Sequence, residues 1–197
     1  MKIKKFLIFA ISITLFFSSF SKLYSIEPDV FVQSTVNRAS KVLSGNFSKE
    51  VKIEKLKSIA EETVDIDILG LYTLGSHRKI LNNDQKKEYK ILFRKYFLKS
   101  FSSRLAEYSN PEIQVNSKKQ ISKNYTIVSS SLVATEKRPE VKIDWRIYTK
   151  DPENPLIRDL IIEGLSLART QKEEFSSIIQ SNDNDINALF ENLREFI

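Results

Sequence analysis

The sequence predicts a single α+β domain, in which a four-stranded antiparallel meander sheet has one face covered by N-terminal and C-terminal helices. Two changes of apolar spacing predict this fold class. Apolar residues recur every three or four positions from residue 28 to about residue 108, and again after residue 170, which is helical spacing. Between residues 111 and 167 the period falls to two, which is strand spacing, and no helical segment separates the strands.

The first part of the domain contains two amphipathic helices and a short apolar segment. Pro28 suits the first turn of the first helix, and Gly45 ends that helix. Ser48 is placed to cap the second helix. The short segment that follows contains Gly70 and Gly75, two of the four glycines in the chain. Such glycines indicate backbone positions that other residues occupy at a cost.

The clearest helix begins at Asn82 and continues to about Tyr108. Asn82 and Gln85 have the spacing of a capping box. Asn110 and Pro111 end the helix. The apolar face is mostly aromatic, and its members in helical register are Tyr89, Leu92, Phe93, Tyr96, Phe97, Phe101, Leu105 and Tyr108.

The strands follow in sequence order. Ile113 and Val115 predict a short first strand, and the β-branched segment Tyr125–Val133 predicts the second. The third strand is the most regular, because Val141–Tyr148 alternates apolar residues with polar or charged ones.

A fourth strand and two helices complete the domain. The fourth strand is predicted over Leu156–Leu167, with Gly164 as a bulge or kink. Thr170 and Glu173 have capping-box spacing for the next helix, and Asp185 is placed to cap the last one.

The first 25 residues predict a secretory signal peptide. Three lysines within positions 2–5 precede an apolar run from Phe6 to Phe17, and small serines follow it. An uncleaved membrane anchor is the alternative, but about 20 apolar residues are needed to cross a bilayer. We therefore expect export, cleavage after Ser21 or Ser25, and one domain over residues 26–197.

Composition excludes several classes of site. The chain has no Cys and one His, so it has no disulfide, thiolate metal site, cysteine nucleophile or multi-histidine metal site. Removal of the first 25 residues takes away four lysines. The 31 basic residues then become 27 against 25 acidic ones, and the net charge falls from +6 to +2. This is too little for a strong nucleic-acid footprint. We expect no metal, no nucleic acid and no cofactor.

The sequence contains few of the residues and motifs that catalytic sites commonly use. His77 is the only imidazole, and the adjacent Arg78 disfavours its protonated form. No Gly-x-Ser-x-Gly motif supplies a nucleophile. We interpret His77 as a partly exposed loop residue and expect no catalytic residue.

Two pairs of carboxylates, Asp65 with Asp67 and Asp159 with Glu163, are the remaining candidates for acid–base chemistry. The simpler interpretation is that they are solvent-facing acids. Strands with one buried face commonly carry such acids in ion pairs. The expected partners are lysines on neighbouring strands, Arg146 and Arg158.

The unusual feature is the amount of apolar surface on the long aromatic helix, the third strand and the terminal helices. It predicts either a solid core or helices and sheet that do not close completely and leave an apolar cavity. Composition does not separate the two, because a core and a cavity lining use the same residues.

Several spaced residues resemble the MlaC family, the toluene-tolerance-type auxiliary proteins of bacterial intermembrane lipid transport. The resemblance runs in order from about Pro28 to Leu193. His77 departs from the family pattern, which usually has a large aromatic residue before the arginine. The matching residues are Asp65, Leu74-Gly75-x-x-Arg78, Gln85, the aromatic series Tyr89–Tyr108, Trp145-Arg146, Asp159-x-x-x-Glu163-Gly164-x-Ser166-Leu167 and Phe175.

The resemblance implies a monomeric periplasmic carrier of a Gram-negative cell that is not an enzyme. Its cargo is a phospholipid whose acyl chains lie in the apolar cavity between sheet and helices. Its implied partners are an inner-membrane ABC transporter complex with an MCE-domain protein and an outer-membrane lipoprotein–porin complex. Lipid exchange between them would maintain outer-membrane lipid asymmetry.

On this view, Leu71, Tyr72 and Leu74 form a movable wall hinged at Gly70 and Gly75. Arg78 or Arg146 meets the headgroup phosphate. The remaining lipid-binding residues are expected on the long helix and on strands three and four, and they are Phe93, Tyr96, Phe97, Val141, Ile143, Trp145, Ile147, Leu160 and Ile162.

Two other functions remain open. One is a small periplasmic hydrolase or isomerase of an apolar substrate, which needs a buried acid with a shifted pKa, such as Asp65 or Asp144, facing the cavity. The other is an adaptor whose apolar face receives a partner protein.

Overall fold

The computed structural model describes residues 25–136 and 138–197, so the predicted signal peptide lies almost wholly outside the described residues. In the part that is described, no helix is long and apolar enough to span a membrane. The elements are α1 (Pro28–Ser44), α2 (Lys49–Thr63), α3 (Ile66–Thr73), the short 3₁₀ helix η1 (His77–Lys79), α4 (Asn83–Leu105), β1 (Ile113–Ser122), β2 (Tyr125–Leu132), β3 (Val141–Tyr148), β4 (Leu156–Ile162), β5 (Leu165–Ser166), α5 (Leu167–Gln180) and α6 (Ile186–Phe196).

The described strands form one antiparallel sheet in the order β1-β2-β3-β4-β5, so the predicted α+β class and the meander are confirmed. The sheet has five strands rather than four. Glu163 and Gly164 have φ values of 49° and 83°, and the turn that they form divides the predicted fourth strand. Beyond this turn, β5 folds back and pairs with β4.

Two element boundaries differ from the prediction. Helix α5 begins at Leu167, because the Ser166 side chain accepts a hydrogen bond from the backbone N–H of Arg169. The predicted capping box at Thr170 was therefore wrong. Strand β1 extends to Ser122, since its backbone pairs with β2 although its second half is exposed and lacks an apolar face.

The predicted caps of the other helices are confirmed. Asn82 and Gln85 form the capping box of α4. Ser48 caps α2, and Asp185 caps α6. Asp65, which was not predicted as a cap, accepts a hydrogen bond from the backbone N–H of Ile68 and caps α3.

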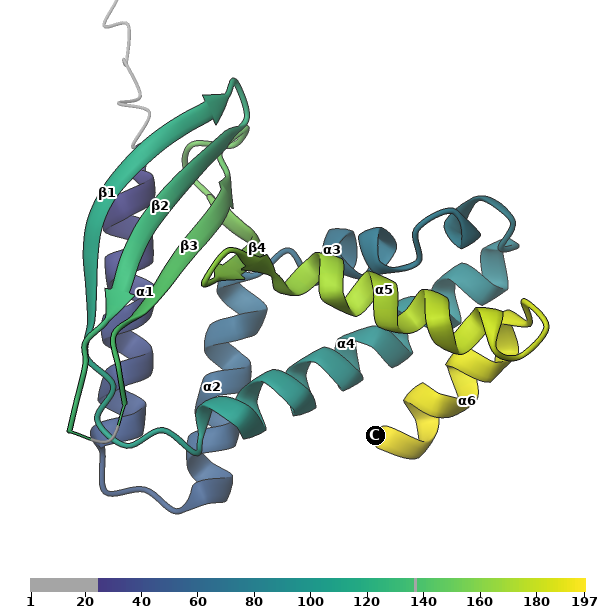
Figure 1. Cartoon of the computed structure of the whole chain (residues 1–197), viewed down its shortest axis with the longest axis horizontal. Coiled ribbons are helices and arrows are strands. Elements are labelled where there is room, and N and C mark those ends of the chain that lie inside the picture. The colour runs from purple at the N-terminus through teal and green to yellow at the C-terminus, as the bar shows by residue number, and fades with distance from the viewer. Residues whose placement is uncertain (1–24, 137) are drawn as a thin grey trace, which may run out of the picture.

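Figure 1 shows α1 lying along one face of the sheet, while α4 and α5 extend away from it toward α6. The buried apolar residues accordingly form two clusters. One lies between α1 and strands β2–β4, and the other between α3, α4, α5 and α6. The space between these clusters is where a cavity can form.

The two glycines of the third segment have different roles. Gly70 lies inside α3, where an added Cβ would be 2.7 Å from Cδ1 of Phe93. Gly70 thus permits α3 to pack closely against α4. Gly75 has a φ of 56°, in the region that favours glycine. A hinge at Gly70 and Gly75 stays a prediction.

Asp67 links α3 to α4. Lys90 Nζ lies 3.3 Å from Asp67 Oδ2, and an Arg94 nitrogen lies 3.2 Å from Oδ1. Partial burial raises the pKa of Asp67, but the hydrogen bonds from Lys90 and Arg94 outweigh it and hold the pKa below its ordinary value of 3.8. A carboxylate with a depressed pKa stabilises the fold above its unfolded pKa and loses that contribution as the pH falls through its folded pKa.

We therefore expect Asp67→Asn to lower the free energy of unfolding at pH 7 by up to about 1 kcal/mol, since the pair is partly exposed. The deficit should shrink below about pH 4. Urea unfolding at pH 7 and pH 3 measures it, with the exposed Glu191→Gln as control. A deficit that is the same at both pH values would contradict the ion-pair account.

Candidate functional site

A cavity of about 560 Å³ lies between the sheet and the helices. Its lining comes from α1 to α5 and from all four long strands. Most of the side chains that form it are aliphatic or aromatic. Those contributed by the first two helices are Val36, Ala39, Leu43, Leu56, Ile59 and Ala60, and Val64 follows directly after α2.

The sheet side of the cavity is formed by β3 and β4. Val141, Ile143 and Trp145 point to one face of β3 because strand residues alternate. A register shift in the pairing of β3 with β4 brings apolar side chains of β4 to the same face of the sheet. Arg146 pairs with Asp159 while Ile147 pairs with Ile157, which leaves Arg158 as the extra residue of a bulge.

The bulge determines which β4 side chains reach the cavity. Beyond it, Leu160 pairs with Trp145, and Ile162 pairs with Ile143. The bulge therefore places both β4 residues on the cavity face together with Ile157.

The polar atoms of the sheet wall are satisfied within the protein. The indole N–H of Trp145 donates to the hydroxyl of Ser130 at 2.8 Å, and that hydroxyl donates to the carbonyl of Ile143 at 3.2 Å. Because these groups are paired, Trp145 can present its apolar ring surface to the cavity without an unpaired donor.

The opposite wall is the aromatic face of α4. Phe93, Tyr96, Phe97 and Phe101 all line the cavity. The rings of Phe97 and Phe101 stack with centroids 5.4 Å apart, and those of Phe93 and Phe97 lie 6.2 Å apart. These stacked rings make a rigid apolar surface.

The structure brings most of the predicted lipid-binding residues together. Those that line the cavity are Phe93, Tyr96, Phe97, Val141, Ile143, Trp145, Leu160 and Ile162. The other four do not line it. Leu74 and Ile147 are fully buried in the two core clusters. Leu71 packs against the cluster around α4, and Tyr72 is 40% exposed.

Neither arginine predicted for the headgroup lines the cavity. Arg78 is exposed in η1. Arg146 alternates with Trp145 and so lies on the opposite face of β3, where its guanidinium is 3.7 Å from Asp159. His77, also in η1, is partly exposed as predicted.

Three other arginines line the cavity, and they are Arg104, Arg138 and Arg158. Arg158 was expected only as an ion-pair partner, and the other two were missed in the sequence. Arg104 could have been found, because it lies three residues after Phe101 on the aromatic face of α4. Arg138 carried no such signal, since it follows β2 in a loop. Its Nε is buried without a hydrogen-bond partner among the described residues.

The candidate acids are engaged in structural interactions. Asp65 pairs with Arg158 at 2.8 Å. Arg158 also donates to the hydroxyl of Tyr125 at 2.7 Å, and its guanidinium lies 3.5 Å from the ring centroid of Tyr148. Asp144 is on the β3 face that points away from the cavity.

The expectation for Asp159 requires correction, because this residue is buried rather than solvent-facing. Its carboxylate accepts hydrogen bonds from the Ser166 hydroxyl at 2.6 Å and from the Ala168 backbone at 3.0 Å. The turn at Glu163 brings the start of α5 over the end of β4 and covers it. Across the described ranges, no group of three or more His, Cys, Asp or Glu residues is placed to hold a metal.

Comparison with solved structures finds the same fold in a phospholipid-binding protein from Ralstonia solanacearum, whose structure contains a phospholipid. The two share 18% sequence identity with a TM-score of 0.72, over 87% of this chain and 97% of that one. Comparison with curated proteins finds no match. The model of the MlaC protein family matches residues 33–195, so this chain belongs to the MlaC family.

Proposed function

We propose that this protein is a periplasmic phospholipid carrier that takes up the acyl chains of one lipid between its sheet and helices. It would exchange this lipid between an inner-membrane ABC transporter complex with an MCE-domain protein and an outer-membrane lipoprotein–porin complex, and so maintain outer-membrane lipid asymmetry. The observation that carries the proposal is the apolar cavity between β3–β4 and α4. Membership of the MlaC family and the phospholipid in the Ralstonia solanacearum structure support it.

The size of the cavity supports a ligand rather than a packing defect. On the scale measured for cavities made by truncating side chains, about 24 cal/mol per Å³, a closed empty cavity of 560 Å³ would cost roughly 13 kcal/mol. That equals the whole stability of a typical domain, about 5–15 kcal/mol. A volume of this size is therefore not a packing defect, and its apolar walls favour an apolar occupant over water.

Acyl chains suit this lining. Hiding one methylene from water is worth about 0.8 kcal/mol, so two chains of about sixteen carbons total roughly 25 kcal/mol. A free phospholipid therefore leaves a bilayer very slowly. A cavity with alkyl and aromatic walls removes most of this penalty, and transfer into it from a bilayer is close to thermoneutral. The partners, and no covalent step in this chain, would then set the direction of transport.

Native mass spectrometry of the protein purified from cells tests the proposal. We expect a retained diacyl phospholipid at one molecule per protein. The purified protein should also move a fluorescent phospholipid from donor to acceptor vesicles faster than spontaneous exchange. A protein that carries no lipid and hydrolyses an ester substrate would instead establish the enzyme alternative. A protein that carries no lipid and has no such activity would favour the adaptor alternative.

A further inference from the structure

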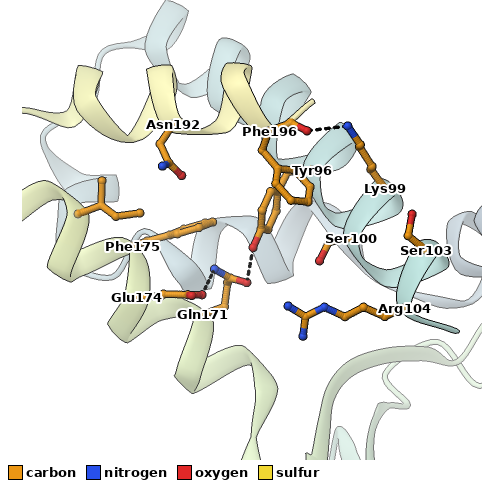
Figure 2. Close-up of a pocket in the computed structure, with 11 residues that line it drawn as sticks. Tyr96, Lys99, Ser100, Ser103, Arg104, Gln171, Glu174, Phe175, Asn192 and Phe196 are labelled. Carbon is orange, nitrogen blue, oxygen red and sulfur yellow. Dashed lines mark hydrogen bonds between the residues drawn. The ribbon is translucent and has the colours of Figure 1, made fainter. Parts of the chain in front are cut away.

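A second pocket of about 530 Å³ lies beside the apolar cavity, between α4, α5 and α6 (Figure 2). Its lining differs in kind, since polar side chains outnumber apolar ones. The polar residues that line it are Lys99, Ser100, Ser103, Arg104, Gln171, Glu174 and Asn192.

The two volumes adjoin, because five residues line both. They are Tyr96, Ser100, Arg104, Gln171 and Glu174. Each of the five carries a polar group, whereas most of the other residues around the larger cavity are apolar. The protein therefore has a mostly apolar compartment that adjoins a more polar one. An amphipathic ligand that spans the boundary would place its chains on one side and its polar group on the other.

A chain of hydrogen bonds crosses this boundary from α4 to α5. The Tyr96 hydroxyl donates to Gln171 Oε1 at 2.9 Å, and Gln171 Nε2 donates to Glu174 Oε2 at 2.8 Å (Figure 2). Burial raises the pKa of Tyr96, so this phenol stays protonated and donating at neutral pH. Both the oxygen and the nitrogen of the Gln171 side-chain amide are therefore hydrogen-bonded.

Two opposite charges are left available at the boundary. Lys99 is occupied, because its Nζ donates to the backbone carbonyls of Phe196 at 2.7 Å and Ile197 at 3.1 Å. By contrast, Arg104 and Glu174 form no ion pair with any described residue. The pocket therefore offers one guanidinium and one carboxylate.

We propose that this second pocket is the headgroup site, and that it selects a zwitterionic headgroup with a phosphate and a primary ammonium, the chemistry of an ethanolamine phospholipid. Arg104 binds the phosphate, and Glu174 accepts hydrogen bonds from the ammonium. A choline headgroup carries the same charges but has no N–H to donate. A glycerol headgroup lacks the positive charge. This proposal rests on the proposed function, since it concerns the polar end of the same lipid.

Vesicles with equal amounts of ethanolamine and choline phospholipids of the same acyl chains test the selectivity. After incubation and re-isolation of the protein, the bound lipids are counted by mass spectrometry. We expect wild-type protein to carry ethanolamine lipid about fivefold over choline lipid, the ratio that one hydrogen bond of about 1 kcal/mol supplies. Glu174→Gln keeps an acceptor for Gln171 and should bring this ratio close to one, because the ammonium loses its charged acceptor.

Two further variants complete the test. Glu173→Gln changes an exposed neighbour on α5 that lines neither volume, and it should leave the ratio at its wild-type value. Arg104→Gln should lower retention of both lipids alike, because both contain the phosphate. A wild-type ratio of one, or a ratio that Glu174→Gln leaves unchanged, would overturn the headgroup site while total occupancy still supports the carrier. A wild-type protein with no lipid at all would instead overturn the carrier.

Discussion

Two carboxylates placed on the cavity face of β3, by Trp145→Asp together with Ile143→Asp, should remove bound phospholipid from the purified protein. Both residues line the cavity between the sheet and α4. An unpaired carboxylate in apolar surroundings costs several kcal/mol. Because about 1.4 kcal/mol is a factor of ten in affinity, we expect lipid per protein to fall at least tenfold. Extraction and mass spectrometry of the lipid, with circular dichroism of the same sample, measure this result.

The matched control places two carboxylates on the outer face of the same sheet. Ile127 and Ile161 are partly buried there and do not line the cavity, so Ile127→Asp with Ile161→Asp should retain lipid.

A second variant, Ala39→Trp, fills the cavity from α1 without adding charge. If the Trp145→Asp, Ile143→Asp double variant and Ala39→Trp both keep their lipid, the lipid does not bind in this cavity.

Asp159→Ala should give the largest loss of stability among substitutions of charged residues. The Asp159 side chain is 2% exposed, and it joins β4 to the start of α5 through Ser166 and Ala168. Its loss leaves the Ala168 N–H and the Arg146 guanidinium without their acceptor. A buried donor left without its acceptor typically costs about 1–3 kcal/mol, and Asp159 accepts two hydrogen bonds there. We expect the free energy of unfolding to fall by about 3 kcal/mol, measured by urea denaturation.

Asp144→Ala is the control for this prediction. Asp144 lies on the face of β3 that also carries Arg146, is partly buried, and forms no ion pair with a described residue. Its removal should change stability by less than about 0.5 kcal/mol. Equal losses in the two variants would show that the contacts of Asp159 contribute little.

Local patterns in the sequence determine much of this fold. The capping box at Asn82, the alternation of Val141–Tyr148 and the meander order are all visible without a structure. The prediction failed where pairing depended on distant backbone. The exposed half of β1 has no apolar face, and the turn at Glu163 needed a positive φ at a non-glycine residue.

Part of the cavity lining was predictable for similar reasons. Strand alternation placed Ile143 and Trp145 correctly, and the helical period placed Phe93 and Phe97. Alternation alone did not distinguish Ile147, which lies on the same β3 face but is buried in the core against α1. The contributions of α1 and α2 depend on how these helices pack across the sheet, which no local pattern encodes.

A crystal structure of the protein as purified from cells tests the central claim most directly. The account predicts continuous elongated electron density in the cavity, running between Trp145 on β3 and Phe97 on α4. Density that shows only ordered water there, or side chains that have closed the space, would contradict it.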